Sequence, residues 1–196
     1  MYRVHGNIDI KRRDGVKARS THTGFKKILQ EDFKYICGYC GKDSKLFKED
    51  YQIDHFIPKS IYPEGKGDYY NLVYSCRKCN RNKWDKWPTG NVSKSHDGNV
   101  GFVDPVLPEY DKHLKRDING KIIPITNLGV YIVNELKLDL RRTEEVWAIM
   151  MLAKKKERLE KIIDSKKDDV DPEKLIVYYK LTKALDKYLN EWYNRR

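Results

Sequence analysis

The stretch SCRKCNRNK at residues 75–83 decides how this chain folds. It carries a C-x-x-C pair followed at once by polar and basic residues, and CGYCG at residues 37–41 carries a second pair. Two such pairs supply the four thiolates of a tetrahedral structural Zn²⁺ site. A redox motif would explain only one pair, and disulfides rarely persist in a reducing cytosol. The sequence therefore predicts a structural zinc site formed by Cys37, Cys40, Cys76 and Cys79.

The elements next to the cysteine pairs are predicted to follow the order strand, loop, strand, helix. YQIDHFI (51–57) alternates, is rich in strand formers, and is followed by a proline and a turn-rich loop. YYNLVYSC (69–76) predicts the second strand, and a short helix starting near Cys79 fits the breaker-free residues 77–87. Helically spaced apolar residues at 25–36 predict another short helix before the first cysteine pair.

The C-terminal third predicts two helices. Thr143 is a good N-cap and is followed by two glutamates, which suit the positive end of a helix. DSKKDDVD (164–171) interrupts the apolar pattern, and the sequence Asp-Pro-Glu at 171–173 begins a new helix with a cap and a preset φ. We expect an antiparallel helical hairpin, or an apolar stripe that awaits a partner.

The predicted fold class is α+β: a ββα finger with a four-cysteine zinc site, followed by a mostly helical C-terminal region. A two-residue Asn-Gly turn at 119–120 predicts a β-hairpin between the two parts, and residues 130–140 fit either strand or helix. The predicted segments are a basic arm that is extended or poorly ordered (1–23), a core with both zinc knuckles (24–90), a connecting loop and hairpin (91–141), and the helical hairpin (142–196).

The charge of the chain points to a polyanionic partner. Forty Lys and Arg residues against 29 Asp and Glu give a net charge of +11, and nucleic acid is the leading candidate. The alternatives are a merely soluble basic protein and, less favoured, an anionic membrane surface. No apolar run approaches the roughly 20 residues of a membrane span, and the first residues lack a secretory apolar region. We expect a soluble cytoplasmic protein.

Several polar residues remain that zinc does not explain. Asp54 and His55 are adjacent on the first predicted strand, while Asn80 and Lys83 lie one turn apart on the predicted helix. Carboxylate and amide oxygens suit a hard cation of the Mg²⁺ type. A histidine with a pKa near 6.5 suits proton removal at neutral pH. These residue types predict a site that combines a metal ligand set with a base.

These residues resemble the HNH nuclease motif, the ββα-metal finger, in its zinc-bracketed form. The resemblance covers about residues 37–87 through IDHFIP, the Asn-Leu pair at 71–72 and CRKCNRNK. It implies that His55 is the general base and that Asp54 and Asn80 hold the catalytic ion. Because asparagine replaces the family's final histidine, Mg²⁺ or Mn²⁺ is favoured there. It further implies that Asn71 holds the loop next to His55 in place through backbone hydrogen bonds and that Lys83 contacts a phosphate.

Each of these residues also has a structural interpretation. His55 could be a satisfied strand histidine, Asp54 a turn carboxylate, and Asn80 a helix cap, while Asn71 is structural in either case. Lys83 could belong to a solvated basic face with two neighbouring arginines, Arg77 and Arg81. The remaining histidines and two tryptophans are interpreted as surface and core residues respectively: His5, His22, His96 and His113, and Trp84 and Trp87.

The sequence therefore supports two classes of function. The first is a metal-dependent HNH endonuclease acting on DNA, with RNA left open. The alternative is a non-catalytic zinc-ribbon module that binds nucleic acid or a partner. The layout also resembles the small HNH proteins of Septu-type bacterial anti-phage systems. That resemblance implies a role in antiviral defence and an ATPase partner, which the C-terminal helices would bind.

Overall fold

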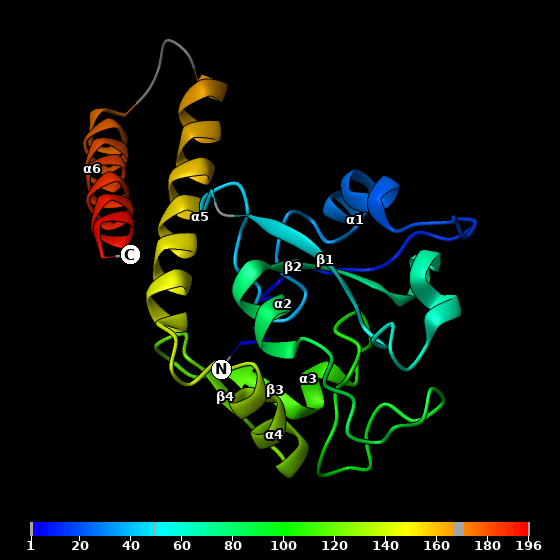
Figure 1. Ribbon diagram of the computed structural model, residues 1–196. Helices are drawn as coiled ribbons and strands as arrows, with labels where there is room; N and C mark the ends of the chain where they lie inside the picture. Colours follow the sequence, from blue (N-terminus) through cyan, green and yellow to red (C-terminus); the bar gives the residue numbers. More distant parts are fainter. Residues whose placement is uncertain (1, 49, 167–170, 196) are drawn as a thin grey trace. The chain divides into compact units, whose positions relative to one another are not determined.

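The computed structural model describes residues 2–48, 50–166 and 171–195 (Figure 1). Its internal contacts divide the chain into two units, Met1–Thr143 and Glu144–Arg196. The first unit holds both small antiparallel sheets, and the second is helical. The predicted α+β fold class, with small sheets and a helical C-terminal region, is confirmed.

The centre of the first unit is a ββα finger made of β1 (Tyr51–His55), β2 (Leu72–Cys76) and α2 (Arg77–Lys83). The two strands are antiparallel, with His55 opposite Leu72. Every residue of β2 is buried, which explains why its sequence, LVYSC, is almost continuously apolar. Two 3-10 turns, Pro63–Gly67 and Tyr69–Asn71, occupy the loop between the strands. The predicted order of strand, loop, strand and helix is therefore found, although the helix begins two residues before Cys79.

The first cysteine pair, Cys37 and Cys40, forms a knuckle that follows α1 (Lys26–Asp32), which is preceded by a 3-10 turn, η1 (Thr23–Phe25). The helix is shorter than predicted, because the chain turns sharply after Phe33, where the next two residues have positive φ. Gly41 also has a positive φ of 68°, and a Cβ there would lie 2.7 Å from the carbonyl oxygen of Val4. Glycine is thus required at this turn by conformation and by the close approach of the arm.

The N-terminal arm runs over the first unit without regular secondary structure, apart from a bridge between Tyr2 and Arg116. Val4 and Ile10 are buried in the same core as the cysteines. Arg12 donates to the carbonyl oxygen of Leu72 at 2.8 Å and forms an ion pair with Asp104 at 2.7 Å. The described residues of the arm are therefore extended and anchored, and the alternative of a poorly ordered arm does not fit.

A second layer of the first unit contains α3 (Tyr110–His113), β3 (Leu114–Arg116), β4 (Ile122–Pro124) and α4 (Asn127–Glu135). The Asn-Gly sequence at 119–120 lies between β3 and β4, so the predicted hairpin is present. Its turn is longer than the predicted two residues, because the N–H of Asp117 donates to the carbonyl oxygen of Lys121 at 2.9 Å and residues 118–120 lie between them. Of the ambiguous residues 130–140, those up to Glu135 belong to α4 and the others form turns. Thr126 caps α4 by accepting a hydrogen bond from the N–H of Gly129. The buried Arg116 joins the hairpin to the zinc knuckle, because its guanidinium donates to the carbonyl oxygen of Cys40 at 2.7 Å.

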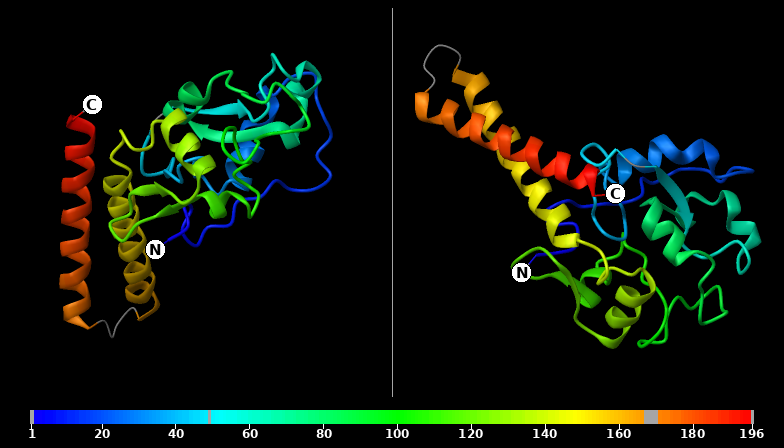
Figure 2. Two further views of the ribbon diagram at one scale, coloured as in Figure 1. Left: turned by 90° about the horizontal axis from the view of Figure 1, so that it is seen from below. Right: turned by 60° about the vertical axis from the view of Figure 1, so that its left-hand side comes forward.

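The second unit contains α6 (Pro172–Asn194) and nearly all of α5 (Thr143–Lys166), which lie side by side (Figure 2). The helices are antiparallel: Glu145 pairs with Arg195 at 3.3 Å, and Glu160 accepts from the hydroxyl of Tyr178 at 2.7 Å. Asp171 caps α6 through the N–H of Glu173. The predicted interruption falls partly at residues 167–170, which lie outside the described part of the chain. Among the described residues, no helix is both long and apolar enough to cross a membrane.

Candidate active site and zinc centre

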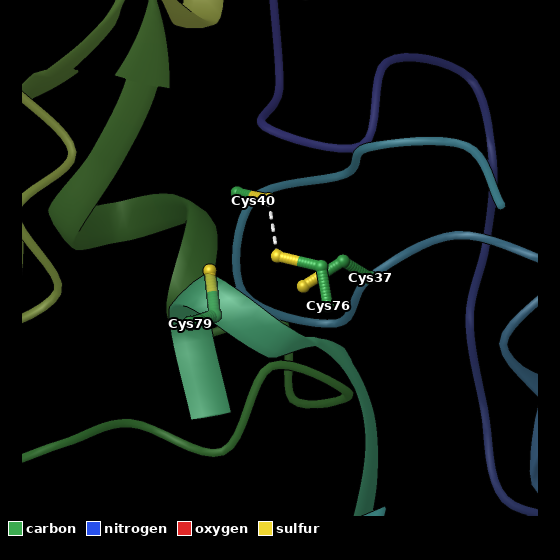
Figure 3. Close-up of side chains that lie close together, drawn as sticks. All are labelled: Cys37, Cys40, Cys76 and Cys79. Carbon is green, nitrogen blue, oxygen red and sulfur yellow. Dashed lines mark hydrogen bonds between the residues drawn. The ribbon is translucent and has the colours of Figure 1, made fainter. Parts of the chain in front are cut away.

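The four cysteines form one buried cluster (Figure 3). Their sulfur atoms all lie within 4.8 Å of one another, and the Sγ atoms of Cys40 and Cys76 are 3.8 Å apart. Tetrahedral zinc with Zn–S bonds of about 2.3 Å requires sulfur atoms about 3.8 Å apart, so this geometry fits the ion. Two cysteines come from the knuckle after α1 and two from the junction of β2 and α2. These residues could hold a structural zinc ion that joins the two segments.

An arginine that no sequence pattern singled out lies against this cluster. The guanidinium of Arg141 donates to Cys79 Sγ at 3.0 Å and lies 3.5 Å and 3.6 Å from the Sγ atoms of Cys76 and Cys40. Burial lowers the pKa of Arg141, but the negative charge of the thiolates outweighs this and leaves that pKa raised. Four thiolates around Zn²⁺ carry a net charge of about −2. The buried guanidinium would offset part of this charge.

A cleft of about 570 Å³ opens beside the finger. Its wall includes three of the predicted site residues, Asp54, His55 and Asn80. The structure therefore brings the end of β1 and the middle of α2 to one cavity. Three basic side chains also line it: Lys59, Arg77 and Arg81.

The ring of His55 is held by a backbone group. Its Nε2 lies 3.0 Å from the carbonyl oxygen of Lys66, which can only accept a hydrogen bond. Nε2 therefore carries the proton in the neutral ring, and Nδ1 keeps a lone pair. Burial lowers the pKa of His55, and neighbouring lysines lower it further, although its bond to Lys66 opposes them. The imidazole is consequently neutral at pH 7 and has a proton-accepting nitrogen.

Asp54 points inward and shares its Oδ2 between two donors. The hydroxyl of Tyr39 donates to it at 2.5 Å, and the ammonium of Lys83 lies 3.3 Å away. Burial raises the pKa of Asp54, and this effect exceeds the opposing effects of Lys83 and Tyr39. Tyr39 lies between the two cysteines of the first knuckle, and nothing in the sequence there predicted its hydrogen bond to Asp54. The carboxylate is thus connected both to the zinc knuckle and to α2.

Lys83 does not occupy the position that the family resemblance implied. Its side chain is fully buried, and its Nζ donates to the carbonyl oxygen of His55 at 2.9 Å. A buried ammonium with these partners cannot contact a phosphate in the cleft, so that expectation is corrected. The interpretation of a solvated basic face also fails for Lys83, whereas its neighbours Arg77 and Arg81 are exposed.

The two asparagines differ in what they bind. Asn71 clamps the backbone of Ile57: its Oδ1 accepts from the N–H at 2.8 Å, and its Nδ2 donates to the carbonyl oxygen at 3.0 Å. This clamp lies two residues after His55 and holds the loop that leaves β1. Asn80 donates from Nδ2 to Gln52 Oε1 at 2.7 Å. Its Oδ1 accepts no hydrogen bond from the described residues, and Asn80 lines the cleft.

Two of the histidines expected at the surface are not fully exposed: His5 is buried, and His22 is half-buried and lines the cleft. His22 meets the His55 ring edge-on, with ring centroids 4.8 Å apart, and its Nδ1 is buried without a partner among the described residues. His5 is buried against Gly38, and burial lowers its pKa to about 4. The arm that carries both histidines has no periodicity, so the sequence held no signal of these positions.

The two tryptophans expected in the core also differ. Trp87 is buried and packs edge-on against Phe56, as expected. Trp84 is 74% exposed and lines the cleft, so the core assignment is wrong for this residue. The difference follows from the end of α2, because Trp84 is the first residue after the helix and takes a positive φ.

Comparison with known proteins finds similarity over the part of the chain that holds the cysteines and the ββα finger. Residues 37–86 match the family model described as HNH endonuclease. The Septu protein PtuB of Bacillus thuringiensis is 27% identical over 122 residues, which cover 57% of this chain and 41% of that protein. This chain thus spans less than half of that relative's length, and no solved structure gave a significant match. The residues that match the HNH endonuclease model include the whole ββα finger and all four cysteines.

Proposed function

We propose that this protein is a metal-dependent endonuclease that hydrolyses DNA phosphodiester bonds in the cleft beside the finger. The observation that carries the proposal is the placement of Asp54, His55 and Asn80 in one cavity. The match of residues 37–86 to the HNH endonuclease family supports a nuclease function. The net charge of +11 and the basic cleft wall support a nucleic-acid substrate.

His55 is the general base of the proposed reaction. Because Lys66 holds the proton on Nε2, Nδ1 can accept a proton from a water molecule in the cleft. The resulting hydroxide attacks phosphorus in line with the leaving 3′ oxygen, so the products carry 5′-phosphate and 3′-hydroxyl ends. A positioned base of this kind contributes about 10²–10⁴-fold to the rate.

Asp54 and Asn80 are the proposed ligands of the catalytic ion. Their oxygen atoms suit Mg²⁺ or Mn²⁺, and both residues line the cleft that holds His55. When bound, such an ion stabilises negative charge on the phosphoryl and leaving oxygens. Lys83 opposes the effect of burial on the pKa of Asp54 and so favours its ionised form, while its bond to the His55 carbonyl fixes the end of β1. The four cysteines would hold the separate structural Zn²⁺.

A non-catalytic zinc-ribbon module would need the cysteines and the positive charge alone. It would not need a neutral imidazole that lines a cleft and has one nitrogen held by a carbonyl. The arrangement of His55 therefore favours the enzyme over the module.

We further propose a role in anti-phage defence together with an ATPase partner. The support is the similarity to the Septu protein PtuB, which extends over 57% of this chain. The second unit is the proposed docking element, since α6 exposes several large apolar side chains: Leu175, Ile176, Val177, Tyr179 and Tyr188. Co-purification of a tagged chain with an ATPase encoded by the neighbouring gene would support this role. Retention of the ATPase after truncation of α6 would contradict the docking element.

The proposed activity is tested by plasmid nicking in the presence of Mg²⁺, Mn²⁺ or Zn²⁺. We expect wild type to nick with Mg²⁺ or Mn²⁺ and His55→Ala to lose at least about 10²-fold in rate. Zinc content and DNA retention should survive the substitution, because neither depends on the imidazole. His96→Ala is the matched control, since His96 is half-buried and outside the cleft wall. Equal nicking by wild type and His55→Ala would exclude His55 as the base.

A further inference from the structure

We propose that Trp84 is a stacking platform for an unpaired nucleobase beside the cleavage site. The inference rests on the proposed function and deepens it, because it assigns the substrate class. The polynucleotide would be bound as a single strand near the scissile phosphate. DNA and RNA both present such a base, and the test below compares them.

The first supporting observation is the exposure of the indole. Trp84 is 74% exposed, whereas the other tryptophans are 6–7% exposed: Trp87, Trp147 and Trp192. Trp84 also lines the cleft, together with His55 and Asn80. A large apolar ring is thus held in solvent at the predicted reaction site instead of contributing to the core.

The second observation is the backbone at Trp84. Its φ of 49° and ψ of −128° lie in a region that side chains disfavour and glycine adopts freely. The N–H of Lys86 donates to the carbonyl oxygen of Lys83 at 3.1 Å, which closes a tight turn with Trp84 at its second position. Glycine is the common residue there. Trp84 therefore has a strained backbone, and its exposed ring packs too little against the protein to offset that strain. Strain that packing does not compensate points to a functional role.

The turn is fixed relative to the proposed catalytic residues. The N–H of Trp84 donates to the carbonyl oxygen of Asn80 at 2.8 Å, and Lys83 just before it bonds to the carbonyl oxygen of His55. The backbone that carries the indole is thus attached to both sides of the site. A base stacked on Trp84 would hold the neighbouring phosphate near His55.

The charges of the same wall fit a polynucleotide strand. Lys59, Arg77 and Arg81 can neutralise phosphates, while the flat indole accepts any base face. Proteins that bind single strands combine these two features. In an intact duplex each base face is covered by its neighbours, so the indole can reach a base only where the strand is unpaired or a base is extruded. A docking site for a protein partner is the competing explanation.

The test measures binding in the His55→Ala background without added divalent metal, so that no cleavage interferes. Single-stranded DNA, single-stranded RNA of equivalent sequence and duplex DNA serve as fluorescent probes. Adding Trp84→Ala should weaken single-strand binding roughly 5- to 140-fold and leave duplex binding unchanged. Trp84→Phe should restore part of the affinity, because it keeps a flat ring. Ile118→Ala is the matched control: Ile118 is 85% exposed in the β3–β4 turn and is not part of the cleft wall.

A second variant separates binding from folding. Trp84→Gly should raise the melting temperature, because glycine adopts the positive φ without strain, and should weaken single-strand binding as much as Trp84→Ala does. A lower melting temperature with equal losses on every probe would show a structural role and overturn the proposal. Unchanged single-strand affinity in Trp84→Ala would overturn it as well, in favour of a protein-docking role. If wild type never cuts but Trp84→Ala loses single-strand affinity, the endonuclease proposal fails and the platform stands.

Discussion

The buried ammonium of Lys83 donates to the main-chain oxygen of His55 at 2.9 Å and lies 3.3 Å from the carboxylate of Asp54. One side chain of α2 thereby holds two consecutive residues of β1, both of which line the cleft. The lysine is a positioning residue: it places the proposed base and metal ligand without reaching the cleft itself.

Removal of Lys83 is expected to destabilise the protein. Lys83→Met should lower the free energy of unfolding by about 3–5 kcal/mol, because it leaves the buried carboxylate of Asp54 without its cation. Denaturant unfolding measures the effect. Arg81→Ala is the control, since Arg81 is exposed and its loss should reduce DNA affinity with little change in stability. A stable Lys83→Met protein with weakened DNA binding would restore the phosphate-contact assignment.

The cleavage rate should fall on acidification in a defined range. Both proposed groups act when deprotonated: Asp54 has its pKa raised above 3.8 and His55 has its pKa lowered below 6.5. Protonation of either group removes a ligand or the base, so the rate should fall as the pH drops, and the loss due to protonation of His55 should occur below pH 6.5. Single-turnover rates measure the profile, with circular dichroism at each pH to verify folding. A midpoint above 6.5 would mean either that burial does not lower the pKa of His55 or that the pKa of Asp54 sets the profile.

Loss of the Arg141 guanidinium should weaken zinc binding. Arg141→Leu is expected to reduce zinc affinity about 10- to 100-fold, because the negative thiolate cluster loses a buried cation that donates to its sulfur atoms. Competition with a chromogenic chelator measures the affinity. Arg142→Leu provides the comparison, as the exposed neighbour in the sequence. Equal zinc release from both variants would show that the contacts of Arg141 do not tune the site.

The Asn71 clamp should matter to both stability and activity. Asn71→Ala leaves the N–H and carbonyl group of Ile57 without their side-chain partner and should cost about 1–3 kcal/mol of unfolding free energy. Cleavage should fall further than stability alone explains, because the loop that follows His55 loses its anchor. Rates measured well below the melting temperature separate the two effects. A fully active and stable variant would show that the loop is held by its 3-10 turns alone.

Much of the finger was readable from the sequence for a local physical reason. The cysteine spacing encodes the knuckles, alternation and strand formers encode β1 and β2, and the Asp171-Pro172 cap encodes the start of α6. Each of these signals acts between residues close in the chain, where geometry is nearly independent of the rest of the fold.

Distant contacts were decided only by the tertiary structure. Arg141 lies 62 residues after Cys79 and His22 lies 33 residues before His55, and no periodicity links either pair. Even two neighbouring residues at the end of α2 differ in burial: Lys83 is buried and Trp84 is exposed. A polar or aromatic side chain points inward only where the interior offers it a partner, as the carboxylate of Asp54 does for Lys83. Such partners exist only once separate segments of the chain have packed together.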